Sequence, residues 1–208
     1  MPPIPTTLVF GGSFDPPHMA HIGLPQRVAL AVGADQVLFI PAAKAPHKLG
    51  QVQTPGHHRA AMLALALSDS PWARISTLEL ERARHVAGAP SYTVDTLAAL
   101  NDMLPGRRLR LLMGSDQLMI FQSWKDWRQV VTLAEPAVMV RPPHTRDQVL
   151  AQLPAGLDRN EWAPRLVEVP AMDISSTEIR RKVAAGEDVR GWVDPGVAAY
   201  IQEHGLYR

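Results

Sequence analysis

Short apolar runs alternate with longer stretches of helical pattern along this chain. The apolar runs are 8–10, 37–40, the three consecutive apolar residues that end the stretch 108–113, and 137–140; helix-compatible stretches at 18–32 and 57–67 follow the first two. Runs without polar alternation are typical of strands that are buried on both faces. Strands that alternate with helices predict an α/β fold: a doubly wound, Rossmann-like parallel sheet with helices on both faces. Such sheets bind ligands in the loops at the carboxyl ends of their strands.

The domain organisation is expected to be simple. No repeat, low-complexity tract or linker interrupts the pattern, so we expect residues 1–208 to form a single domain. The stretch from 142 to 164 is the least regular part of the sequence. It is interpreted as an irregular excursion from that domain.

Composition and charge exclude several classes of protein. The chain has 208 residues, of which 46% are hydrophobic and 20% charged, which is an ordinary globular mixture. A net charge of +1 gives no bulk attraction to nucleic acid or anionic membrane, so any anionic ligand must be held locally. The absence of cysteine excludes disulfides, thiolate zinc sites and thiol nucleophiles. No signal peptide is evident and no apolar run approaches the ~18 residues of a membrane span, so we expect a cytoplasmic protein.

The loop after the first apolar run carries a chemically suggestive sequence. Gly11 and Gly12 would let the backbone approach a ligand closely. Asp15 precedes a proline and suits a helix N-cap. A helix that starts here would place His18 and His21 on one face of its first turns. Their ring N–H groups would then lie beside the free backbone N–H groups of the helix N-terminus, which is a site suited to phosphate.

The pair of histidines by itself is weak evidence. A His-x-x-His pattern most often marks a capped helix with two packed or solvated histidines, and zinc ligation is the next alternative. The glycine pair, the Asp-Pro step and the preceding strand favour phosphate binding instead. The loop lacks the spacing of a Walker loop and of a dinucleotide fingerprint.

A second segment near the end of the chain adds further donors. Ser175 and Glu178 have the spacing of a capping box, which predicts a helix beginning at Ser175. Capping alone accounts for these two residues. It does not account for Ser176, Thr177 and Arg180, whose hydroxyl and guanidinium donors again suit phosphate.

Together, the two segments resemble the fingerprint of the nucleotidyltransferase superfamily, a glycine-rich turn with His-x-x-His and a distant Ile-Ser-x-Thr-x-x-Arg. Within it, the chain is similar to the bacterial nicotinate-nucleotide adenylyltransferase family. Further matches follow in family order at Pro46-His47-Lys48, Ser91-Tyr92-Thr93, Gly114-Ser115-Asp116, Trp124 and 200–207. The chain departs from the family pattern at Ser13, where the family usually has Thr, and at Ala20, where it usually has Gly.

The resemblance implies three sets of site residues. The catalytic residues are His18, His21 and Arg180. The ATP-binding residues are Gly11, Gly12, Ser13, Lys48, Gly114, Asp116, Ser175, Ser176 and Thr177. The pyridine-nucleotide-binding residues are Thr93, Trp124 and Arg141. By this resemblance His21 donates to the α-phosphate, and Arg180 with Lys48 holds the leaving pyrophosphate.

Several of these residues also have simpler interpretations. Trp124 could stack on a pyridine ring, or it could pack with Trp127 on one face of a helix. Asp116 could accept hydrogen bonds from ribose hydroxyls or help position a metal, or it could be an N-cap. Both alternatives stay open at the level of sequence.

A basic loop follows the second apolar run. Lys44, His47 and Lys48 could clamp phosphates, or they could form a solvated surface. His47 and Lys48 match the family motif and Lys44 does not, so Lys44 ranks below them. Arg141 follows another apolar run and is a plausible phosphate contact.

The implied reaction joins ATP and nicotinate mononucleotide to give nicotinate adenine dinucleotide and pyrophosphate. The small-molecule substrates are the expected partners, without nucleic acid or membrane. Mg²⁺ is expected to be carried with ATP and to keep much of its water, so we expect few dedicated protein ligands, and none is evident in the sequence. The alternatives are an adenylyltransferase for nicotinamide mononucleotide or phosphopantetheine, and a non-catalytic pyridine-nucleotide-binding module. The Ser-Tyr-Thr segment speaks against phosphopantetheine, and the intact catalytic set weighs against the non-catalytic module.

Overall fold

The computed structural model describes residues 4–44, 53–85 and 90–208. The strands are β1 (Thr6–Gly12), β2 (Gln36–Pro41), β3 (Ala73–Ile75), β4 (Arg108–Gly114), β5 (Glu135–Val140) and β6 (Leu166–Glu168). The helices are α1 (Met19–Ala31), α2 (Gly56–Ala66), α3 (Leu78–His85), α4 (Thr93–Met103), α5 (Ser115–Met119), α6 (Trp127–Leu133), α7 (Arg146–Ala151), α8 (Arg159–Trp162), α9 (Ser176–Ala184) and α10 (Pro195–Glu203). Two 3-10 turns, η2 (Phe121–Ser123) and η3 (Ala163–Arg165), complete these elements.

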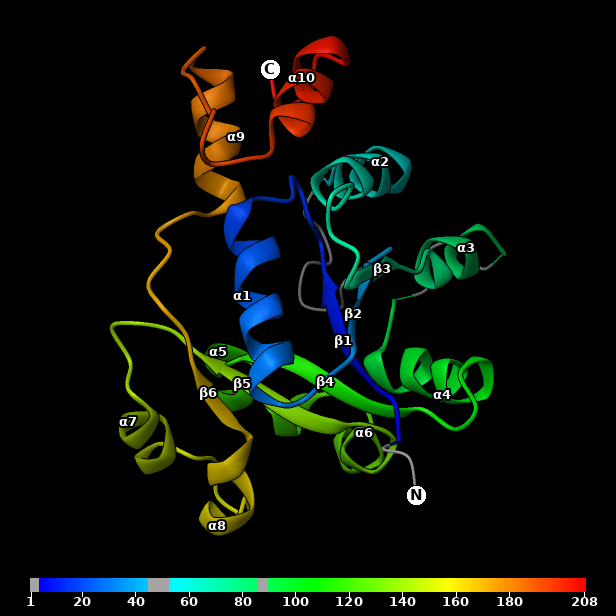
Figure 1. Cartoon of the computed structure of the whole chain (residues 1–208), viewed down its shortest axis with the longest axis vertical. Coiled ribbons are helices and arrows are strands. Elements are labelled where there is room, and N and C mark those ends of the chain that lie inside the picture. Colours follow the sequence, from blue (N-terminus) through cyan, green and yellow to red (C-terminus); the bar gives the residue numbers. More distant parts are fainter. Residues whose placement is uncertain (1–3, 45–52, 86–89) are drawn as a thin grey trace. The chain divides into compact units, whose positions relative to one another are not determined.

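Within the described residues, the strands form one six-stranded sheet in the order β3-β2-β1-β4-β5-β6 (Figure 1). β1 pairs parallel with β4, starting at Thr6 opposite Arg108, and β4–β5 and β5–β6 are parallel as well. The predicted doubly wound α/β fold is therefore confirmed. The strand order reverses between β1 and β4, which is the point where such sheets bind ligands at the strand carboxyl ends.

The apolar runs of the sequence form the buried strands. All residues of β2 except Gln36 and all residues of β5 except Glu135 are buried. Strands covered on both faces need no polar alternation, because neither face meets water. The four apolar runs thus lie in β1, β2, β4 and β5, as predicted.

The Cα positions group the chain into two compact units built from discontinuous segments. One unit comprises 1–10, 24–38 and 92–171, and the other comprises 11–23, 39–91 and 172–208. The first unit carries β4 to β6 and α4 to α8, and the second carries α2, α3, α9 and α10. The expectation of a single domain stays a prediction.

The stretch from 142 to 164, expected to be irregular, contains α7 and α8. Thr145 and Gln148 form a capping box at the start of α7. Asp158 caps α8 by accepting hydrogen bonds from two backbone N–H groups. Trp162 is almost fully buried at the end of α8. Local caps and one buried aromatic ring thus order this stretch.

The core of the second unit joins helices from distant parts of the sequence. Met62 of α2 packs with Ile179 of α9 and with Val197 and Ile201 of α10. Figure 1 shows α10 lying beside α2. This apolar cluster anchors α9, whose first turn carries the second segment of the fingerprint.

No helix among the described residues is both long and apolar enough to cross a membrane.

The start of α9 confirms half of the predicted capping box. The Ser175 hydroxyl accepts a hydrogen bond from the Glu178 backbone N–H at 3.1 Å, so Ser175 is the N-cap. The Glu178 carboxylate instead pairs with Arg181 at 2.7 Å. Its pKa is lowered chiefly by that hydrogen bond. A cation one turn later in the helix competes successfully for this carboxylate.

Replacing Ser175 with Ala should lower the free energy of unfolding by about 1 kcal/mol, because the N-cap acceptor is lost. Ser175→Asn keeps an acceptor and should retain most of the stability. Denaturant melts of the three proteins measure the difference. An unchanged midpoint for the alanine variant would show that the cap contributes nothing.

Three histidines and a tyrosine cluster where α2 meets α10. The His58 ring lies 4.1 Å from the His57 ring and 5.3 Å from the His204 ring. His58 Nδ1 lies 2.9 Å from the Tyr200 hydroxyl oxygen. Burial lowers the pKa of His58 from 6.5, and the charges of His57 and His204 lower it further.

This cluster predicts a pH-dependent stability. Because the folded His58 has the lower pKa, the unfolded chain binds more protons as the pH falls below about 6.5, the ordinary histidine value. The stabilisation is complete above that pH and is lost towards the lower pKa of the folded state. We expect Tm to fall between pH 7 and pH 5, and His58→Gln to reduce the fall. His144→Gln, at an exposed position outside the cluster, should leave the slope unchanged; equal slopes for all three proteins would contradict the assignment.

Candidate active site

The two glycines at the end of β1 lie in different surroundings. A Cβ atom on Gly12 would lie 2.9 Å from the Phe14 ring, so packing within the loop excludes a side chain there. A Cβ atom on Gly11 would meet nothing within 4 Å. The backbone at Gly11 therefore borders open space that a ligand could occupy. The Gly12 carbonyl is fixed by the Ala42 N–H at 2.8 Å.

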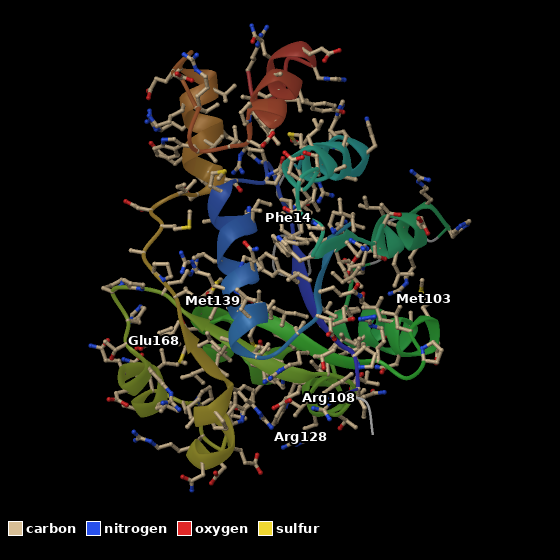
Figure 2. All side chains as sticks on the ribbon, viewed as in Figure 1. Phe14, Met103, Arg108, Arg128, Met139 and Glu168 are labelled. Atoms are coloured by element: carbon tan, nitrogen blue, oxygen red, sulfur yellow. The ribbon has the colours of Figure 1, made fainter. Side chains whose placement is uncertain are left out.

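Phe14 is the packed base of this loop. Figure 2 labels Phe14 in the loop between β1 and α1. Its side chain is 1% exposed, and its φ of 49° lies in the left-handed region that non-glycine residues rarely adopt. The ring meets the His21 ring edge-on at 5.2 Å and lies 6.0 Å from Phe39. Burial of the ring thus holds an uncommon backbone conformation and places an apolar surface against His21.

The two histidines form a stacked pair at the start of α1. Their ring centroids are 3.6 Å apart with an interplanar angle of 22°. The backbone N–H of His21 donates to the backbone carbonyl of His18 at 2.8 Å. His18 lies directly before the helix, and His21 lies in its first turn. His18 is 6% exposed and His21 is half-buried. Ala20 between them is buried, so its methyl group belongs to the packing.

The N-cap interpretation of Asp15 is wrong. α1 begins at Met19, whose N–H donates to the Trp192 carbonyl at 2.9 Å. The Asp15 carboxylate instead accepts hydrogen bonds from the Tyr207 hydroxyl at 2.7 Å and from the Thr54 N–H at 3.1 Å. The two prolines after Asp15 disfavour helical geometry, so the helix starts later and the carboxylate turns to tertiary partners.

The second segment of the fingerprint is hydrogen-bonded to the first. Arg180 Nη1 donates to the Asp15 carbonyl at 2.7 Å across a sequence separation of 165 residues. Arg180 Nη2 lies 3.3 Å from the Thr177 hydroxyl. The Ser176 hydroxyl donates to the Pro16 carbonyl at 2.8 Å. The first turns of α9 therefore lie against the loop that precedes α1.

Arg59 was not among the residues expected at the site. Its side chain is 2% exposed and donates to the Ser13 carbonyl at 2.7 Å and to the Thr54 carbonyl at 2.8 Å. Burial lowers the pKa of Arg59, and the charge of Asp15 opposes that change. The sequence did contain a signal, because Arg59 is the only lysine or arginine in an otherwise apolar part of α2.

The residues expected to bind the pyridine nucleotide lie in the first unit. Thr93 is the first residue of α4. Asp116 and Arg141 face each other with a 3.6 Å ion pair, and their side chains are 61% and 50% exposed. A Cβ atom on Gly114 would collide with the Asp116 carboxylate. Gly114 itself is the N-cap of α5, so the N-cap alternative for Asp116 is wrong.

Trp124 and Trp127 do not share a helix face, so that part of the packing alternative is wrong. Trp124 has extended backbone after the η2 turn, and Trp127 begins α6. Both rings still meet the buried Phe121 ring edge-on, at 5.4 Å and 5.8 Å. Packing on Phe121 orients Trp124 and leaves its ring half-buried.

Lys125 links the tryptophan segment to the Ser-Tyr-Thr segment. Its Nζ atom lies 4.7 Å above the centre of the Tyr92 ring and 3.3 Å from the Asp95 carboxylate. Each contact is weak because the groups are exposed. Together they tie the residue after Trp124 to the start of α4, a link that sequence reasoning missed.

The basic loop is only partly described. Lys44 is exposed, and its carbonyl accepts a hydrogen bond from the Ser91 N–H at 2.9 Å. This bond connects the start of the basic loop to the Ser-Tyr-Thr segment. His47 and Lys48 lie outside the described residues, so their predicted phosphate contacts stay predictions.

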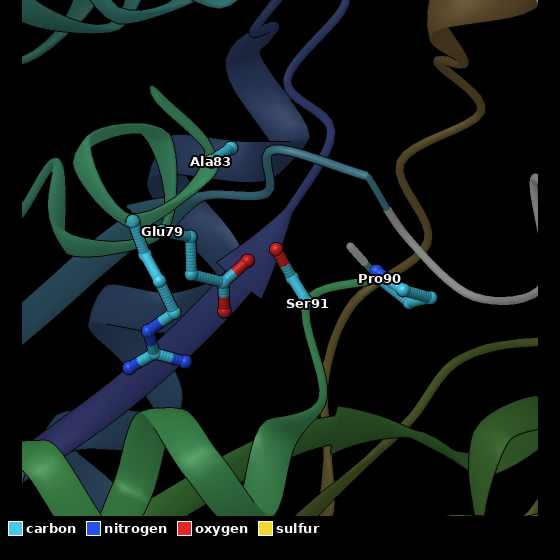
Figure 3. A pocket seen from close by; sticks show the side chains of 5 residues that line it. Glu79, Ala83, Pro90 and Ser91 are labelled. Atoms are coloured by element: carbon cyan, nitrogen blue, oxygen red, sulfur yellow. The ribbon is translucent and has the colours of Figure 1, made fainter. Parts of the chain in front are cut away.

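Two cavities lie in the second unit. The smaller has a volume of about 20 Å³ and is lined by Glu79, Arg82, Ala83, Pro90 and Ser91. Figure 3 shows the Glu79 carboxylate and the Ser91 hydroxyl pointing into the same space. The larger has a volume of about 270 Å³ and is lined by Ala43, Gly56, His57, Arg59, Leu80, Ala83 and Arg84. Its ionisable side chains are all basic, which favours an anion.

Among the described residues, no group of three or more His, Asp or Glu side chains is placed to hold a metal ion. The donors around the loop are histidine rings, hydroxyls and guanidinium groups, and the buried Asp15 carboxylate is already hydrogen-bonded. The hydroxyl and guanidinium donors suit phosphate oxygens.

The chain belongs to the cytidylyltransferase-like family, whose family model matches residues 9–182. Two relatives are each named probable nicotinate-nucleotide adenylyltransferase. The protein from Symbiobacterium thermophilum is 37% identical over 202 residues, covering 96% of this chain and 93% of the relative. The protein from Roseiflexus sp. is 38% identical over 203 residues, covering 96% of both chains.

The fold is also that of a solved nucleotidyltransferase structure. Plasmodium falciparum nicotinic acid mononucleotide adenylyltransferase complexed with NaAD has a TM-score of 0.75 and 19% identity, covering 98% of this chain and 97% of that chain. At this identity, the likeness concerns the fold.

Proposed function

We propose that this protein transfers the adenylyl group of ATP to nicotinate mononucleotide, giving nicotinate adenine dinucleotide and pyrophosphate. The observation that carries the proposal is the 2.7 Å hydrogen bond from Arg180 to the Asp15 carbonyl. It joins the two segments of the fingerprint, so that His18, His21 and Thr177 belong to one compact unit with Arg180. Full-length relatives named for this reaction support the choice of substrates.

The proposed chemistry is an in-line displacement at the α-phosphorus of ATP. A phosphate oxygen of the mononucleotide attacks the α-phosphorus. The bond to the bridging oxygen breaks, and its electron pair leaves with pyrophosphate. The attacking phosphate is already anionic, so no protein nucleophile is required. The protein must align two polyanions and stabilise the charge that develops during transfer.

The ATP-side residues divide into ligand contacts and supports. We assign His21 to the α-phosphate and His18 to the other phosphates, beside the positive end of α1. Arg180 would hold the leaving pyrophosphate through guanidinium N–H groups that the loop does not engage, and Lys48 is assigned to the same pyrophosphate. The hydroxyls of Ser175 and Ser176 already bond protein groups, so we assign these two residues mainly to support.

The remaining ATP contacts follow from the strand ends and the second helix. Gly11 borders the open side of the first loop, Gly12 and Ser13 follow it in the same loop, and Thr177 adds a hydroxyl from α9. Mg²⁺ would be carried by the triphosphate itself, and it neutralises phosphate charge when bound.

The pyridine-nucleotide side is assigned to the first unit. Trp124 offers an aromatic face for the pyridine ring. Thr93 and the N-terminal N–H groups of α4 offer donors for the nicotinate carboxylate. Arg141 offers a cation for the mononucleotide phosphate, and the neighbouring Asp116 and Gly114 are assigned to the ATP ribose.

Nicotinate mononucleotide should be preferred over nicotinamide mononucleotide by at least about 100-fold in kcat/KM, because a carboxamide NH₂ would face donors and stay unpaired. Pyrophosphate release from ATP measures both substrates. Thr93→Val should reduce the preference, whereas Thr132→Val on the exposed face of α6 should not. Equal activity on both substrates would overturn this specificity. Binding without any pyrophosphate release would identify a non-catalytic module.

A cytoplasmic location, which these substrates favour, stays a prediction.

His21→Ala should lower kcat by roughly 10²–10³, the usual loss when one transition-state donor is removed. Steady-state kinetics at saturating substrates measures this effect, and a thermal melt reports the accompanying loss of stacking against His18. The matched control is His144→Ala, at an exposed position, which should keep both kcat and Tm. A near-normal kcat for His21→Ala would remove His21 from the reaction.

A further inference from the structure

The loop from 13 to 16 is held on one side by a closed chain of hydrogen bonds. The Tyr207 hydroxyl donates to the Asp15 carboxylate at 2.7 Å, and the Thr54 N–H donates to the other carboxylate oxygen at 3.1 Å. The Thr54 carbonyl accepts from Arg59 Nε at 2.8 Å, and Arg59 Nη1 donates to the Ser13 carbonyl at 2.7 Å. These hydrogen bonds therefore run from Asp15 through Thr54 and Arg59 back to Ser13, and Tyr207 adds a second donor to Asp15.

We infer that Tyr207 and Arg59 are positioning residues for ATP, which hold the glycine-rich loop in the conformation that accepts the phosphates. The inference rests on the proposed function, because it assigns ATP to this loop. Neither residue is assigned a contact with substrate. Both act through Ser13 and Asp15.

The buried carboxylate gives this network its strength. Asp15 is 6% exposed, so its charge has lost most of its contact with water and depends on protein donors. Burial and the hydrogen bond to Asp15 raise the pKa of Tyr207, so its hydroxyl stays protonated and remains a donor at neutral and moderately alkaline pH. Loss of that donor would leave one oxygen of a buried carboxylate underpaired, which favours a shift of the loop.

The direction of the loop carbonyls explains the link to ATP. Three of them are engaged by side chains: Ser13 by Arg59, Asp15 by Arg180, and Pro16 by Ser176. A carbonyl oxygen carries partial negative charge and repels phosphate. Holding these oxygens towards protein donors keeps them from facing the triphosphate, which is the preorganisation that an anion site requires.

The segment after α10 is built to reach the loop. The Leu206 N–H donates to the Ile201 carbonyl at 3.0 Å, and Tyr207 follows with a left-handed φ of 64°. The side chains of Leu206 and Tyr207 pack against the apolar cluster of α2, α9 and α10. The tyrosine ring is thus held by packing, and its hydroxyl supplies the specific contact.

Tyr207→Phe tests the inference, because it removes the hydroxyl and keeps the ring. The matched control is Tyr200→Phe, which removes a hydroxyl bonded to His58 in the same unit and has no assigned contact with the loop. We expect Tyr207→Phe to raise KM for ATP about 10-fold and KM for the mononucleotide less than about twofold, as loss of one bond to a charged group predicts. Tyr200→Phe should change neither KM, even if it lowers Tm.

Arg59→Lys provides a second variant. Lysine keeps the charge but cannot bridge two carbonyls as the guanidinium does, so KM for ATP should again rise selectively. Asp15→Asn should behave like Tyr207→Phe, because one oxygen acceptor becomes a donor. An unchanged KM for ATP in Tyr207→Phe would overturn the inference. So would an equal rise in KM for ATP and for the mononucleotide that Tyr200→Phe reproduces.

Calorimetric titration with ATP and Mg²⁺, without mononucleotide, separates this inference from the proposed function. Weaker ATP binding in Tyr207→Phe supports the inference even where the wild-type protein fails to release pyrophosphate, which would refute the proposed function alone. Wild-type turnover together with equal ATP affinity in both proteins refutes the inference alone. A wild-type protein that binds no ATP refutes both.

Discussion

The burial of the Asp15 carboxylate is the constraint on which the rest of the candidate site depends. A charge removed from water must be met by protein donors, and these come from Thr54 and Tyr207, with the Arg59 guanidinium nearby. The same residue offers its carbonyl to Arg180. One aspartate therefore gathers segments from the start, the middle and the end of the sequence around a single loop.

The loop in turn fixes the groups assigned to ATP. Phe14 adopts a left-handed conformation beneath Gly12, and its ring supports the stacked histidine pair at the start of α1. A reaction that needs no protein nucleophile depends mainly on aligned donors. Neighbouring groups engage the Ser13, Asp15 and Pro16 carbonyls, the Asp15 carboxylate and the Phe14 ring. A loop held in this way meets that need, because the phosphate donors beside it do not have to be ordered during the reaction.

The two substrates are assigned to residues with different kinds of support. Most of the described residues assigned to the ATP phosphates lie in the second unit, where a partly buried hydrogen-bond network holds the glycine-rich loop. The residues assigned in the first unit rely more on exposed contacts: Arg141 pairs with Asp116, and Lys125 lies above Tyr92, while Trp124 packs against the buried Phe121. Exposed pairs contribute little stability and adapt more readily than buried ones. The elements assigned to substrate specificity can therefore vary with less cost to folding than the glycine-rich loop.

Sequence alone determined the features whose physics is local. Unbroken apolar runs identified the central buried strands, the Ser175 cap identified the start of α9, and residue spacing identified both segments of the fingerprint. Tertiary structure decided the partners. The sequence predicted Asp15 as an N-cap, but its carboxylate accepts a hydrogen bond from Tyr207. Glu178 pairs with Arg181 and does not complete the capping box. Arg59 is buried in a mostly apolar helix, and the sequence analysis did not predict it at the site. A hydrogen bond between residues far apart in the chain leaves no periodic pattern in the sequence, because the fold alone brings donor and acceptor together.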